Sequence, residues 1–178
     1  MSRVGKQPVK VPGNVTVAID GSKIVVKGPL GQLERQMPSG IKVSKDDGVL
    51  KVERSDDSRV QRGKHGLSRT LICNMIIGVT QGYRKELSIE GTGFKAQVQG
   101  NKVILSLGFA SPKEYLIPEG IKVSEKQGVQ LTIEGLSKEL VGQAAARIRS
   151  YYPAEPYKGK GIKYVGEQIR RKQGKTVA

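Results

Sequence analysis

The sequence predicts an α+β protein made of two tandem copies of one small domain, each an antiparallel sheet covered by one helix, with an extended basic C-terminal segment. Three observations predict this fold class. The chain repeats itself at a period of about 80 residues, each copy places alternating strands before one periodic helix, and the pattern is lost after Pro153. The expected domains are residues 1–82, 83–152 and 153–178.

The repeat is visible in three matches that occur in the same order. Residues 38–44 (PSGIKVS) recur as residues 118–124 (PEGIKVS), and residues 21–26 (GSKIVV) match residues 100–105 (GNKVIL). Downstream, residues 48–53 parallel residues 128–134 with one inserted residue. A period this long, present in only two copies, indicates a duplicated domain with its joint near Gly82 rather than a solenoid.

The strands of the first copy follow from alternation and turn chemistry. Val15, Val17 and Ile19 alternate with polar residues, and Asp20-Gly21 supplies a hairpin turn. Further strands are expected over residues 23–27, 33–37, 41–43 and 49–52.

A helix is expected from about Asp57 to Gly78. Its buried face is predicted from four apolar residues, Val60, Leu67, Leu71 and Met75. Gly63 and Gly66 weaken its first half, which favours a later start.

Two single residues of this helix raise the question of chemistry. His65 is the only histidine and has no Cys or His companion, so we expect it at the surface or in contact with RNA rather than in a catalytic or metal site. Cys73 lies among Leu71, Ile72 and Ile76, and we expect it to be a buried small apolar residue.

The second copy repeats this order. Strands are expected over residues 87–89, 95–98, 103–107, 114–117, 121–123 and 129–133. A helix is expected from about Lys138 to Tyr151, and Pro153 ends it. Its predicted buried stripe consists of Leu140, Val141, Ala144, Ala145 and Ile148.

Charge indicates the class of partner. The 178 residues carry a formal net charge of +15, and residues 145–178 alone hold nine Lys and Arg against two Glu. Such a charge favours polyanions, with nucleic acid first and an anionic membrane surface second. No apolar run is long enough to span a membrane, the start carries no apolar signal segment, and one cysteine fits a reducing compartment, so we expect a cytoplasmic protein.

The basic C-terminal segment is the candidate RNA-binding site. Four of the six tyrosines, Tyr151, Tyr152, Tyr157 and Tyr164, lie in or beside it, which a merely solubilising tail would not need. Lysines can meet phosphates, glycines let the backbone approach closely, and tyrosine rings can stack on bases. The candidate residues are Tyr157, Lys158, Gly159, Lys160, Gly161, Lys163, Tyr164, Arg170, Arg171, Lys172 and Lys175.

Nothing in the sequence indicates an enzyme, a metal site or a cofactor. The Gly-rich stretches at residues 28–31 and 158–161 lack the pattern of a nucleotide-binding loop, and the acids are scattered. Two alternatives remain. A membrane-surface protein would require a basic amphipathic helix, and liposome flotation would test this alternative. An enzyme acting on RNA would require a general base or a metal site, and a nuclease or methylation assay would test that one.

The residues then resemble a known family. Residues 153–164 (PAEPYKGKGIKY) look like the C-terminal signature of large-subunit ribosomal protein six, the L-six family. The opening MSRVGKQPVKVP, residues 26–33, residues 78–83 and residues 105–109 resemble other parts of the family, so the resemblance covers essentially the whole chain. Leu30 stands where the family commonly has lysine, and Ala110-Ser111 where it commonly has Ser-His.

The resemblance implies a bacterial-type structural protein of the large ribosomal subunit with no enzymatic activity. It implies binding to the large (23S-type) ribosomal RNA near the factor-binding region, the stalk base and the sarcin–ricin loop, beside neighbouring ribosomal proteins. The RNA-contacting residues it implies are Tyr157, Lys158, Gly159, Lys160, Gly161, Lys163 and Tyr164. The basic end at Arg170, Arg171, Lys172 and Lys175 extends that set. When free, such a protein is expected to be monomeric and to bind no small-molecule substrate.

Overall fold

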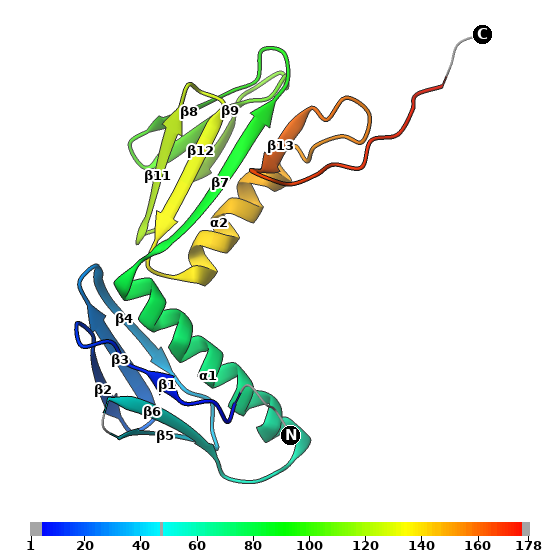
Figure 1. Ribbon diagram of the computed structural model, residues 1–178. Coiled ribbons are helices and arrows are strands. Elements are labelled where there is room, and N and C mark those ends of the chain that lie inside the picture. Colours follow the sequence, from blue (N-terminus) through cyan, green and yellow to red (C-terminus); the bar gives the residue numbers. More distant parts are fainter. Residues whose placement is uncertain (1–4, 47, 176–178) are drawn as a thin grey trace. The chain divides into compact units, whose positions relative to one another are not determined.

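The computed structural model describes residues 5–46 and 48–175, and these divide into two compact units. One unit runs to Tyr83 and includes Leu136–Lys138, and the other covers Arg84–Gly135 and the chain from Glu139 onward. Each contains antiparallel strands and one helix (Figure 1), which confirms the predicted α+β class in two copies.

The first unit contains two three-stranded antiparallel sheets rather than the one that was predicted. One sheet has the order β2-β3-β4 and the other β1-β6-β5. The strands are β1 (Val9–Lys10), β2 (Thr16–Asp20), β3 (Lys23–Gly28), β4 (Gly31–Gln36), β5 (Ile41–Asp46) and β6 (Val49–Arg54). Asp20 pairs with Lys23, so a two-residue turn joins β2 to β3 as the sequence predicted.

Helix α1 (Arg59–Thr80) begins where side chains can satisfy its first N–H groups. The Ser58 hydroxyl accepts a hydrogen bond from the Gln61 N–H at 3.3 Å, and the Asp56 carboxylate accepts one from the Ser58 N–H at 2.7 Å. The helix ends at Thr80, and two residues later the positive φ of 75° at Gly82 lets its N–H donate back to the Gly78 carbonyl. The start lies two residues after the predicted one.

The predicted face of α1 was right at Met75, which is buried, and wrong at Val60 and Leu67. Val60 and Leu67 are 64% and 55% exposed, whereas Ile72, Met75, Ile76 and Val79 are buried. These four follow the i, i+3, i+4, i+7 spacing of a helix face and pack with Val26, Leu50 and other strand residues. Cys73 is half-buried against the same core.

His65 is also not where the sequence placed it. Its side chain is 4% exposed, one ring nitrogen lies 2.8 Å from the Val52 carbonyl, and the other lies 3.1 Å from the Arg54 guanidinium. Gly5 lies directly against the ring. The residue therefore joins α1 to β6 inside the first unit, and the expectation of a surface or RNA-contacting histidine is overturned.

The second unit repeats the same order of elements and adds one strand. Its sheets have the orders β10-β9-β8 and β11-β12-β7-β13. The elements are β7 (Tyr83–Glu90), β8 (Lys95–Gln99), β9 (Lys102–Ser106), β10 (Lys113–Leu116), β11 (Ile121–Lys126), β12 (Gln130–Gly135), α2 (Lys138–Ser150) and β13 (Gly161–Tyr164). Strand β13 has no counterpart in the first unit and comes from the predicted C-terminal segment.

Helix α2 buries the predicted stripe apart from its first member. Val141, Ala144, Ala145 and Ile148 are buried, while Leu140 is 38% exposed. Within the described residues, neither α1 nor α2 is long and apolar enough to cross a membrane.

Candidate nucleic-acid interface

The C-terminal segment is built into the second unit through β13. Gly161, Ile162, Lys163 and Tyr164 pair antiparallel with β7, and Ile162 is fully buried. On the other side, the Ile162 N–H donates to the Tyr152 carbonyl at 2.8 Å. The loop between α2 and β13 is therefore held at both of its ends.

Gly161 allows this close packing. Its φ is +134°, and a Cβ at this position would lie 2.8 Å from the Tyr152 oxygen, the Pro153 oxygen and the Ala154 Cα. Real Cβ atoms essentially never approach backbone atoms so closely, so a side chain here would displace one chain or the other.

A partly buried ion pair holds the chain after β13. Glu167 accepts hydrogen bonds from the Arg149 guanidinium of α2 at 2.5 and 3.1 Å, and from the Tyr164 N–H at 3.0 Å. The hydrogen bond from Arg149, helped by that from Tyr164, lowers the pKa of the Glu167 carboxyl below its usual value. The same bond raises the pKa of Arg149, so both groups are charged near neutral pH.

Two of the predicted RNA-contacting side chains already have partners in the protein. The Tyr164 ring centroid lies 5.4 Å from the Arg149 guanidinium and 5.7 Å from the Lys85 ammonium. Lys163 forms a 2.6 Å ion pair with Glu90. Both residues therefore help to attach β13 to the rest of the unit.

The end of the segment folds back onto its beginning. The Lys172 N–H donates to the Pro156 carbonyl at 2.7 Å, and the Arg171 guanidinium lies over Gly159. The loop itself is closed by the Glu155 N–H, which donates to the Lys160 carbonyl at 2.9 Å. Residues twelve or more apart in the sequence thus lie side by side.

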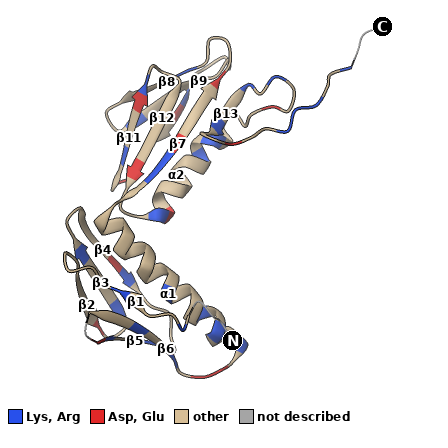
Figure 2. Cartoon of the chain, viewed as in Figure 1, with Lys and Arg blue, Asp and Glu red and all other residues tan. Residues whose placement is uncertain are grey.

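This fold-back brings the loop at residues 156–160 beside residues 171–172, and we call six side chains in and next to these two stretches the basic loop surface. They are Tyr157, Lys158, Lys160, Arg170, Arg171 and Lys172. Figure 2 shows Lys and Arg along this part of the chain, where blue predominates. All six are exposed except Lys160, which is half-buried, and Tyr157 is 54% exposed. Lys175 is exposed further along, and the flanking glycines Gly159 and Gly161 are buried.

The composition of this surface suits phosphates. Five cations with an exposed tyrosine suit the backbone and bases of a nucleic acid. No group of three or more potential metal ligands exists among the residues that the structure describes.

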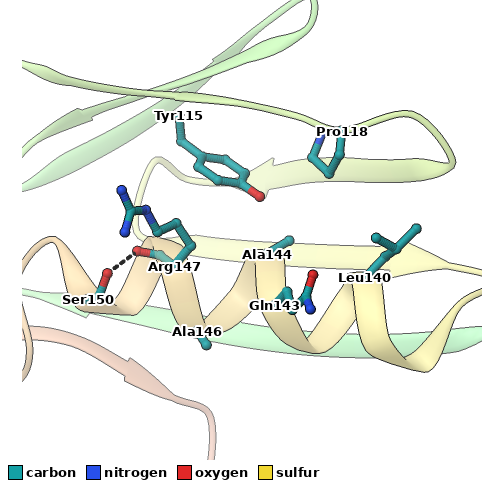
Figure 3. A pocket seen from close by; sticks show the side chains of 8 residues that line it. All are labelled: Tyr115, Pro118, Leu140, Gln143, Ala144, Ala146, Arg147 and Ser150. Atoms are coloured by element: carbon teal, nitrogen blue, oxygen red, sulfur yellow. Dashed lines mark hydrogen bonds between the residues drawn. The ribbon is translucent and has the colours of Figure 1, made fainter.

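A groove of the second unit lies beside α2 (Figure 3). It encloses about 540 Å³ and is lined by Tyr115, Pro118, Leu140, Gln143, Ala144, Ala146, Arg147 and Ser150. Arg147 is its only charged residue, and the lining contains no carboxylate, thiol or imidazole that could act as a base or nucleophile.

Sequence reasoning missed the residues that hold the surface in place. Arg149 was only a basic residue near the end of a helix, and Glu167 was one of two acids in a basic stretch. The only hint in the sequence was that Glu167 stands among cations, which suggests an ion pair but does not show which cation is its partner.

Comparison with known proteins identifies the family. The family model described as Ribosomal protein L6 matches residues 11–82 and 90–165. The chain belongs to the ribosomal protein L6 family. Its two matched stretches correspond to the two structural copies, and the second includes the loop and β13 of the L6 signature but ends before Arg170.

Relatives across the L6 family match nearly the full length. Proteins named large ribosomal subunit protein uL6 from Gloeothece citriformis and Dictyoglomus thermophilum are each 52% identical to this chain, covering 99% of it and 98% of the relative. The protein of that name from Synechococcus sp. is 51% identical with the same coverage. The L6 resemblance first recognised in the C-terminal signature is thereby confirmed.

Proposed function

We propose that this chain is a structural constituent of the large ribosomal subunit, that it catalyses no reaction, and that it binds large-subunit (23S-type) ribosomal RNA through the basic loop surface. The observation that carries the proposal is the fold-back that sets Lys172 against Pro156 and Arg171 against Gly159, which brings the basic end of the chain beside the loop that holds Lys158 and Lys160. Membership in the L6 family supports the ribosomal assignment.

The loop that would bind RNA is already ordered in the free protein. The loop is held by β13, by the Arg149–Glu167 ion pair and by the hydrogen bond between Lys172 and Pro156, so little chain entropy remains to be lost when RNA docks. Cations on the surface would replace counterions condensed on the RNA phosphates. The Tyr157 ring, which is 54% exposed, would stack on an unpaired base or sugar.

The resemblance to the family supports the finer placement. In this proposal the chain lies near the factor-binding region and the base of the stalk, contacts neighbouring ribosomal proteins, and supports subunit assembly and translation in the cytoplasm. It requires no cofactor, and the free protein is monomeric.

The test compares two double charge reversals in the full-length chain. Lys158→Glu with Lys160→Glu removes two cations from the basic loop surface, and Lys42→Glu with Lys45→Glu makes the same charge change on two exposed residues of β5. Binding to large-subunit RNA and to an unrelated RNA of equal length is measured over a salt series.

We expect the first variant to bind ribosomal RNA about ten- to a hundredfold more weakly at physiological salt and to lose about two units of salt slope. The β5 variant should lose much less affinity. Equal losses in the two variants, or equal affinity of the wild type for both RNAs, would reject the basic loop surface as a specific site.

A further inference from the structure

The outward face of α1 carries apolar residues that the fold does not use. Val60 and Leu67 are 64% and 55% exposed, and with Gly63 and Thr70 they form a stripe with the 3-4 spacing of a helix–helix seam. At about 100° per residue, this stripe lies on the side of the helix opposite to Ile72. A Cβ built at Gly63 meets nothing within 4 Å, so the face is open there.

The duplicated domain supplies an internal comparison. The buried residues of α1 (Ile72, Met75, Ile76 and Val79) and of α2 (Val141, Ala144, Ala145 and Ile148) have the same spacing. Aligning these two sets places the start of α2, Lys138, at the level of Arg69 in α1.

Residues 59–68 of α1 therefore have no counterpart in α2. The outward residues of α2 include Gln143, Ala146, Arg147 and Ser150. Its one exposed large apolar residue, Leu140, is 38% exposed, less than Val60 or Leu67. The second unit thus forms the same fold without residues equivalent to Val60 and Leu67, so the fold itself does not require this exposed stripe.

Within α1 the charge beside the stripe has one sign; the exposed Asp56 and Asp57 precede the helix, and Asp57 pairs with Arg54. Helix α1 contains Arg59, Arg62, Lys64 and Arg69 and no acidic residue, and Figure 2 shows Lys and Arg in its first turns. Arg59 and Arg62 lie on one flank of the stripe and Lys64 on the other. Within the described part of the chain, the recorded ion pairs include none to these four residues.

We propose that this outward face of α1 is a docking site for an acidic amphipathic helix of a neighbouring protein; the proposal rests on the chain's being a constituent of a large particle. Apolar residues of the partner would pack on Val60 and Leu67 over the open position at Gly63. Its acidic flanks would face Arg59, Arg62 and Lys64. A second copy of this chain does not fit, because it would bring the three flanking cations of one copy against the same three of the other.

RNA is the competing occupant, and the exposed side chains argue against it. Phosphates would find cations only on the flanks, while Val60 and Leu67 at the centre of the face donate no hydrogen bond. Burying these two side chains against an apolar partner surface would instead be favourable through the hydrophobic effect.

The test places a photo-crosslinking amino acid, p-benzoylphenylalanine, at Leu67 of the full-length chain, with Gln143 on the outward face of α2 as the matched control. Both chains are incorporated into large ribosomal subunits, irradiated, and the adducts are identified by mass spectrometry. We expect the Leu67 probe to give an adduct with an acidic helical segment of another protein, at least about fivefold above the Gln143 probe. Arg59→Glu with Arg62→Glu should reduce that adduct by a similar factor.

Adducts with RNA, adducts with a protein segment that is not acidic, or a yield no higher than that of the control would overturn the proposal. Incorporation of the unmodified chain is scored separately. Its failure would contradict the ribosomal function itself, whereas normal incorporation with no acidic partner at Leu67 would contradict only the docking site. Should the probe at Leu67 alone prevent incorporation, Val60 takes its place with the same expected and contrary results.

Discussion

Gly161→Ala should detach the C-terminal segment from the second unit without unfolding the unit. The new methyl group would lie 2.8 Å from three backbone atoms, those of Tyr152, Pro153 and Ala154, none of which can move aside as a flexible side chain could. The alanine would also have to adopt a φ of +134°, which L residues rarely do.

The size of the effect follows from these two costs. A positive φ costs an L residue roughly 1–2 kcal/mol, and forced overpacking adds roughly 1–3 kcal/mol. The smaller entropy of alanine in the unfolded chain offsets about 0.4–1 kcal/mol. The β13 pairing should therefore lose about 2–4 kcal/mol, which corresponds to a roughly thirtyfold to several hundredfold rise in its opening equilibrium.

Hydrogen exchange measures this opening directly. The reporters are the Ile162 N–H, bonded to the Tyr152 carbonyl at 2.8 Å, and the Val165 N–H, bonded to the Glu86 carbonyl at 3.0 Å. Gly166→Ala is the control, because Gly166 has a φ of +86° but nothing within 4 Å of its Cβ position. We expect the Gly166 variant to change exchange by about fifteenfold or less, because only the cost of its positive φ applies there. Equal exchange in the two variants would refute the argument that backbone crowding at Gly161 holds the segment.

Three further perturbations have defined outcomes. Glu167→Gln should destabilise the second unit by about 1 kcal/mol at pH 7, as measured by thermal unfolding. Because the pKa of Glu167 is lowered in the folded protein, the extra stability of the wild type over this variant should be complete above the usual pKa of 4.5. It should vanish as the pH falls through the folded pKa. A stability difference that does not depend on pH would contradict the role of the Arg149 ion pair. His65→Ala should cost the first unit about 1–3 kcal/mol, because the Val52 carbonyl loses its buried partner, and an unchanged melting temperature would contradict this. Tyr157→Ala should weaken RNA binding by about 1–3 kcal/mol while Tyr157→Phe leaves it unchanged, and equal binding by all three proteins in a filter assay would exclude stacking.

Pre-ordering links these predictions to function. Gly161→Ala and Glu167→Gln leave every cation of the basic loop surface in the sequence. Any loss of RNA affinity in these variants would therefore measure the ordering of the loop rather than its charge. The Lys158 and Lys160 reversals do the opposite, since they change charge on a loop that stays attached.

Local patterns in the sequence determined much of the fold. The repeat of residues 38–44 at residues 118–124, the turn at Asp20-Gly21 and the stop at Pro153 depend on neighbours in the chain. Both helices and the strands other than β1 and β13 were accordingly predicted to within a few residues. The C-terminal signature was likewise enough to recognise the family, because it is a contiguous run of residues.

Only the tertiary structure decided which side of α1 is buried and how the C-terminal segment is held. Two apolar faces compete along α1, and contact with the strands selects Ile72 and Val79 over Val60 and Leu67. The ion pair of Arg149 with Glu167 and the return of Lys172 to Pro156 join residues far apart in the chain. No periodicity or composition encodes such contacts, because they depend on where β13 enters the sheet, and that is a property of the whole second unit.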